Sequence, residues 1–178
     1  MQAGDAVEDA LDSVLLCARL PLTLQAYAAH ATQHGHRVVQ QLTETFALMF
    51  CDGFAVMVDG EAPLARIPVV GLFEDDDDES EPYPWVEATT DPARLVSVFG
   101  SLRAALILRL GAPTCEVPGP VSCCAWTLPG TVLALLWNDE GDAHIGERST
   151  VDLRIAPRAS LVDLPASVAT VFAWPIEY

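Results

Sequence analysis

The chain has 178 residues, 51% of them apolar, which is enough to bury one hydrophobic core, so we expect a single domain over residues 1–178. Its 25 acidic residues outnumber 9 basic ones, all of them arginine, and the formal net charge is -16. Such a charge repels nucleic-acid phosphates and anionic lipid headgroups, which argues against nucleic acid and membranes as partners.

The N-terminal residues and the cysteines predict a cytoplasmic protein. Residues 1–12 contain acids and no base, unlike a secretory signal, and no apolar stretch approaches the roughly 20 residues that span a bilayer. The cysteines are odd in number and two of them are adjacent, which does not fit a disulfide framework. They are Cys17, Cys51, Cys115, Cys123 and Cys124. We therefore expect reduced thiols in a reducing compartment.

Two helices are predicted near the N-terminus. Apolar residues recur at helical spacing from Asp5 to about Leu20, and the pattern resumes after Pro21, which can open a second helix. Gly35 is a typical C-terminal stop for that helix.

Strands are predicted after this point, because residues 36–60 are rich in Val, Phe and Thr. Asp52-Gly53 lies between two apolar runs and strongly indicates a hairpin turn. A further strand is expected over residues 65–73, where Pro68 favours an edge position or a bulge.

A central helix follows an acidic loop at residues 74–84. Asp91-Pro92 combines an N-cap with a proline at the first helical position, and apolar residues then recur at helical spacing as far as Leu110. Gly111 ends the pattern. The apolar stripe predicts that this helix packs across a sheet.

The C-terminal third predicts paired strands. Residues 121–128 and 131–137 flank Pro129-Gly130, and the second run is apolar enough to be buried on both faces. Residues 148–156 alternate, which predicts that Val151, Leu153 and Ile155 face the core while Thr150, Asp152 and Arg154 face water. A short helix is expected within residues 160–174.

Together these elements predict an α+β fold: a single, mostly antiparallel sheet of five or six strands, with N-terminal helices and a central helix packed on it. No internal repeat is visible.

The sequence contains no recognisable catalytic or cofactor motif. His30 and His34 are four residues apart, with His36 just beyond, but no second ligand pair accompanies them, so we interpret them as a solvated helix end and expect no metal. Cys123 and Cys124 must point to opposite faces of a strand, and at least one should be core. We expect no cofactor, and an enzyme would need a site assembled by the fold from residues such as Glu44, Asp52 and His36.

The acidic run at residues 74–81 has two interpretations. It is either a solubilising loop or a loop whose negative charge attracts a basic partner, with neighbouring aromatic residues as anchors. In the second case the partner-binding residues are Asp75, Asp76, Asp77, Asp78, Glu79, Tyr83 and Trp85.

Two resemblances bear on function. The helix stop Leu110-Gly111-Ala112-Pro113, the run Trp126-Thr127-Leu128-Pro129-Gly130 and the strand from Val151 to Pro157 resemble small immunity-type proteins of bacterial polymorphic toxin systems. The order of elements resembles the dimeric chaperones that hold secretion-system effectors, although the second N-terminal helix and the acidic loop depart from that pattern. Neither family implies catalytic residues.

The leading hypothesis is a non-enzymatic cytoplasmic protein that binds and neutralises a basic protein partner, most concretely a toxin. The alternatives are a homodimeric effector or secretion chaperone, and a small enzyme whose site is assembled only in the fold.

Overall fold

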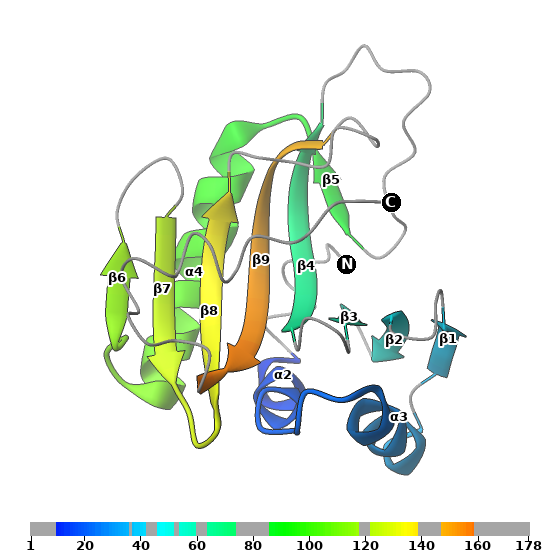
Figure 1. The fold of residues 1–178 in the computed structure, drawn as a ribbon. Helices are drawn as coiled ribbons and strands as arrows, with labels where there is room; N and C mark the ends of the chain where they lie inside the picture. The colour runs from blue at the N-terminus through cyan, green and yellow to red at the C-terminus, as the bar shows by residue number, and fades with distance from the viewer. Residues whose placement is uncertain are drawn as a thin grey trace.

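A computed structural model describes residues 10–35, 37–41, 46–51, 54–59, 64–73, 86–117, 122–138 and 147–158. Within these residues the chain forms a single sheet with three helices packed on one face (Figure 1). The α+β class and the mostly antiparallel sheet are therefore confirmed. Among the described residues the sheet has nine strands rather than five or six, because the strand at residues 37–41 is not distinguished in the sequence from the hairpin that follows it, and those at residues 87–89 and 115–117 are too short to show a period.

The helices are α2 (Leu11–Cys17), α3 (Leu24–Gln33) and α4 (Pro92–Leu110). Helix α4 begins and ends as predicted: the Asp91 carboxylate accepts a hydrogen bond from the Ala93 amide at 2.9 Å, and Gly111 follows the helix at φ 83°. Helix α3 starts at Leu24, later than Pro21, because the Thr23 hydroxyl caps it by accepting from the Ala26 amide at 3.2 Å.

The strands follow the order β1-β2-β3-β4-β9-β8-β7-β6 across the sheet, and β5 pairs with β4. All neighbours are antiparallel except β5, which is parallel to β4. Their bounds are β1 Arg37–Gln41, β2 Phe46–Cys51, β3 Phe54–Asp59, β4 Leu64–Phe73, β5 Glu87–Thr89, β6 Cys115–Val117, β7 Ser122–Thr127, β8 Thr131–Asn138 and β9 Glu147–Pro157.

Both predicted hairpins are confirmed by strand register. Cys51 pairs with Phe54, so β2 and β3 are joined by the two residues of the Asp52-Gly53 dipeptide. Thr127 pairs with Val132, and Gly130 in the connecting turn has φ 87°, a conformation that glycine adopts without steric cost.

Strand β4 divides its outer edge between two partners. Its first residues pair with β3 and its last residues pair with the parallel strand β5. Pro68 lies between these two contacts, at a register irregularity in the pairing with β9. This irregularity agrees with the predicted edge position or bulge, and the missing amide hydrogen of Pro68 lies at a position where neither β3 nor β5 pairs with β4.

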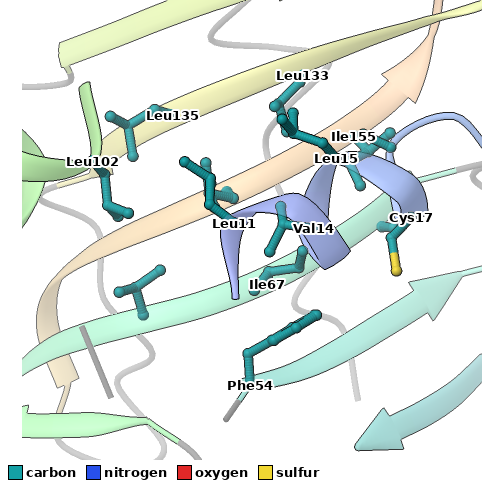
Figure 2. Close-up of a cluster of buried hydrophobic side chains, with 14 of the residues drawn as sticks. Leu11, Val14, Leu15, Cys17, Phe54, Ile67, Leu102, Leu133, Leu135 and Ile155 are labelled. Atoms are coloured by element: carbon teal, nitrogen blue, oxygen red, sulfur yellow. The ribbon is translucent and has the colours of Figure 1, made fainter. Parts of the chain in front are cut away.

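The main core lies between the sheet and the helices. Leu11, Val14 and Leu15 of α2 point toward the sheet, where Ile67 of β4, Leu133 of β8 and Ile155 of β9 meet them (Figure 2). Leu102 of α4 extends the same cluster. Phe99 is only partly buried, and its ring is tilted relative to that of Trp137, with ring centroids 6.3 Å apart. The Phe99 ring therefore lies at the edge of this core.

The opposite face of the sheet departs from expectation. Strand β8 is buried on both faces, as predicted, but Thr150, Asp152 and Arg154 of β9 are buried as well, although they were expected to face water. Apolar residues surround them on β4, β7 and β8, including Leu64, Ala134 and Leu136. The alternation in β9 therefore separates an apolar face from a second buried face that contains charged groups.

The burial of α4 yields a matched test on a single helix. Leu102 is 1% exposed, so Leu102→Ala should lower the free energy of unfolding by about 2 to 5 kcal/mol, because it leaves a cavity in the core. Leu108 is 87% exposed, and Leu108→Ala should change that free energy by no more than about 0.5 kcal/mol. Urea denaturation followed by circular dichroism measures both. Equal losses from the two variants would contradict the assigned packing of α4.

Candidate functional site

The predicted partner-binding residues, Asp75 to Glu79 with Tyr83 and Trp85, lie outside the described residues. The same holds for Glu44, Asp52 and His36, and for the helix expected within residues 160–174. The interpretation of the acidic run thus remains a prediction.

The two described histidines meet each other. The rings of His30 and His34 are in contact at the end of α3, with centroids 4.4 Å apart and planes tilted by 42°. His30 is buried, contrary to the interpretation as a solvated helix end, because its position falls on the core-facing side of α3 together with Tyr27 and Ala31. The described residues contain no group of three potential metal ligands.

The cysteines behave as small hydrophobic residues. Cys123 and Cys124 are both buried and belong to clusters on opposite faces of the sheet, as the strand period predicts. Burial raises the pKa of Cys123 to about 12, and the neighbouring thiols add to the shift. Burial also raises the pKa of Cys124, although its contact with Arg103 opposes the shift. A thiol with a raised pKa is a poor nucleophile at neutral pH.

The most distinctive arrangement of charged groups is one that the sequence did not indicate. Asp152 of β9 is 0% exposed and accepts hydrogen bonds from two arginines. Arg66 of β4 donates through Nε at 3.0 Å and through Nη2 at 3.1 Å, in bidentate geometry. Arg154 donates through Nη2 at 2.8 Å. We call these three residues the Asp152 cluster.

The two arginines decide the charge state of Asp152. Burial on its own would raise the pKa of this carboxyl group, but attraction to Arg66 and Arg154 outweighs burial and leaves the pKa below its ordinary value. The carboxylate is therefore ionised at neutral pH and both of its oxygens are engaged. Such a group is a weak general base, so the Asp152 cluster acts as a cross-link between β4 and β9.

The described part of this buried face also contains polar atoms without partners. Arg154 Nε and the Thr150 hydroxyl are buried and make no hydrogen bond. Residues two and four apart on β9 share one face, so both side chains lie on the face that bears Asp152. The one available signal for this arrangement was the alternation of Thr150, Asp152 and Arg154, which is equally typical of a solvated face.

The arginines of α4 form ion pairs with carboxylates as well. Arg94 forms a bidentate pair with Glu87 of β5, Arg103 pairs with Glu116 of β6, and Arg109 pairs with Asp12 of α2. Among the described side chains, five arginines thus bind to acids of the same chain, those three together with Arg66 and Arg154. Their positive charges are neutralised within the fold, so they do not balance the other acids of the chain.

Comparison with known proteins identifies no relative: no family model, no curated protein and no solved structure matches the chain. In the described part of the chain, no helix has the length and apolar character needed to cross a membrane.

Removal of the buried charge of Asp152 should be costly. Asp152→Asn leaves Arg66 and Arg154 buried without their counter-ion, and we expect the free energy of unfolding at pH 7 to fall by about 3 to 5 kcal/mol. Because the folded pKa of Asp152 lies below that of the unfolded chain, its charge stabilises the fold above about pH 4, and this contribution is lost as the pH falls through the folded pKa. The difference from wild type should therefore narrow below about pH 4.

The matched control is Asp12→Asn, which breaks an exposed pair with Arg109 and should cost about 1 kcal/mol or less. Urea denaturation at several pH values measures both variants. A wild-type advantage over Asp152→Asn that stays constant from pH 7 to pH 3 would contradict the assigned charge state.

Proposed function

We propose that this protein is a non-enzymatic binding protein that captures and neutralises a basic protein partner, as an immunity protein does for a toxin. The observation that carries the proposal is the charge: 25 acids against 9 arginines. A surface of one sign attracts a partner of the other sign and raises the rate of encounter.

The arrangement of ion pairs strengthens this argument. Because Arg66, Arg94, Arg103, Arg109 and Arg154 bind to acids of the same chain, they cannot offset the negative charge elsewhere. Seven acids in residues 74–81 concentrate that charge in one stretch of sequence. Tyr83 and Trp85 follow directly and supply side chains of the type that anchors protein interfaces.

The chemistry of the described residues also favours binding over catalysis. The thiol of Cys123 has a raised pKa, and Asp152 has a lowered pKa and engaged oxygens. A catalytic thiol needs a lowered pKa or an adjacent base, and a general base works best with a pKa near the operating pH, so neither group is suited to catalysis.

The proposal is tested through a partner captured by the purified full chain, identified by mass spectrometry and then produced separately. Association and dissociation rates are measured by surface plasmon resonance at low and high salt. Replacing Asp75, Asp76, Asp77 and Asp78 by Asn should slow association about 10-fold or more at low salt, because it removes the steering charge. Trp85→Ala should speed dissociation and leave association nearly unchanged.

The control for net charge is the variant Asp139→Asn, Glu140→Gln, Asp142→Asn, Glu147→Gln, which removes the same number of acids from another stretch of the sequence. It should slow association less than the change at residues 75–78. A captured partner that is not basic, or a rate and salt dependence unaffected by the change at residues 75–78, would overturn the proposal.

A second candidate is the homodimeric chaperone, which one feature of α4 favours. Between Ala93 and Leu108 its solvent-exposed positions contain no charge, although the chain is strongly acidic, and the exposed Arg109 beyond them pairs with Asp12. These positions, the outer face of α4, are Ala93, Val96, Ser97, Gly100, Ser101, Ala104 and Leu108. Val96 is 55% exposed and Leu108 is 87% exposed. Two copies of an acidic protein can meet with least repulsion across such a face.

Size-exclusion chromatography with light scattering distinguishes this candidate. A chaperone dimer that uses the outer face of α4 should become monomeric on Leu108→Asp, because the change places two like charges in the interface. Leu16→Asp is the control, since Leu16 is an exposed leucine of α2 and should leave the dimer intact. A wild-type monomer at micromolar concentration excludes this candidate.

A further inference from the structure

A pocket of about 320 Å³ lies at one end of the sheet, away from the Asp152 cluster. Three segments line it: Arg19–Leu22 between α2 and α3, the Pro129–Thr131 turn between β7 and β8, and Pro157 at the end of β9. Figure 1 shows α2 and the β7–β8 hairpin at this same end. The volume falls at the lower end of the range of about 300 to 1,000 Å³ that is usual for small-molecule sites.

The walls of the pocket are preformed. Three of the lining residues are prolines, whose φ is fixed, and the Thr131 hydroxyl ties the two turns together by donating to the Ala18 carbonyl at 2.6 Å. The Arg158 amide donates to the Gly130 carbonyl at 3.0 Å and fixes the end of β9 against the hairpin. Little conformational freedom is lost when a ligand enters walls held in this way.

The lining combines apolar walls with one cation. Leu20, Leu22 and the prolines supply the apolar surface, and Arg19 is the charged residue of the lining. Arg19 differs from the arginines that bind to acids of the chain, because its exposed side chain makes no hydrogen bond or ion pair with any of the described residues. Arg158, next to the lining residue Pro157, is likewise exposed and has no acidic partner in the described part of the chain. In a protein of net charge -16, two arginines without a carboxylate among the described side chains therefore lie at this pocket, Arg19 in its lining and Arg158 beside it.

We propose that this pocket binds a small carboxylic acid with an apolar body, its carboxylate held by the guanidinium of Arg19. A planar guanidinium matches a carboxylate in bidentate geometry, and the leucine and proline walls accept the apolar body. This binding site is separate from the proposed capture of a basic protein, which requires a negative surface.

The backbone around the pocket favours a small molecule over an extended peptide. A peptide would need free backbone groups to pair with, but Leu128 N–H donates to the Thr131 carbonyl, and the Gly130 carbonyl accepts from Arg158. The prolines have no amide hydrogen to offer. These backbone groups are therefore not free to pair with a peptide, and the side chains of the lining suit a ligand with one charge and one apolar group.

Octanoate is the probe, and the full chain is titrated with it at low ionic strength while amide resonances are followed by NMR. We expect the Leu20, Gly130 and Thr131 amides to shift, and we expect octylamine to produce no such shifts. Arg19→Gln should weaken octanoate binding about 10-fold or more, because it removes a charge-assisted hydrogen bond. Arg19→Lys should retain part of the affinity.

The matched control is Arg109→Gln, which removes the same charge from an exposed arginine that does not line the pocket. It should leave the affinity nearly unchanged. The proposal is overturned if octanoate produces no shifts at millimolar concentration, if octanol binds as tightly as octanoate, or if Arg109→Gln weakens binding as much as Arg19→Gln. A peptide with a C-terminal leucine that binds more tightly than octanoate would overturn the assignment to a small molecule.

Discussion

The buried contact of Asp152 with Arg66 and Arg154 is the constraint on which the rest of the fold depends. It joins β4 to β9, and these two strands carry the residues against which α2 packs, among them Ile67 and Ile155. A slip of one residue in this pairing would turn the charged side chains toward the helices and the apolar ones away from them. The cluster therefore specifies register as well as holding the two strands together.

The pairing of arginines with acids also affects the charge of the molecular surface. Arginines that neutralise acids within the described fold do not offset the other acids, and that excess of negative charge is the basis of the proposed capture of a basic partner. Two regions depart from this pattern: the outer face of α4 is uncharged, and the pocket beside Arg19 has a cation available. The acidic surface, the uncharged outer face of α4 and the pocket beside Arg19 are separate, so the partners proposed for them would not compete.

Local signals in the sequence were sufficient for much of the fold. Asp91, Pro92 and Gly111 define α4, and Asp52-Gly53 and Pro129-Gly130 define two hairpins, because caps and tight turns depend on adjacent residues. The burial of Arg154 and the place of Arg19 could not be predicted, because both depend on contacts between segments far apart in the chain. For the acidic stretch at residues 74–81 the sequence supplies only a composition, and composition does not distinguish a binding surface from a solubilising one.

The divided edge of β4 has a consequence for dynamics. Strand β3 is joined to β4 through the pairs Met57 with Arg66, Val58 with Ala65 and Asp59 with Leu64, whereas β9 pairs along nearly the whole of β4. Two strands joined by few residue pairs separate at a lower free energy than two strands joined by many. The unit formed by β1, β2, β3 and the helix α3 that contacts them can thus detach as one cooperative piece while the β4–β9–β8 centre stays closed. Amide hydrogens of β2 and β3 then exchange with solvent through this partial opening, earlier than those of β8 and β9.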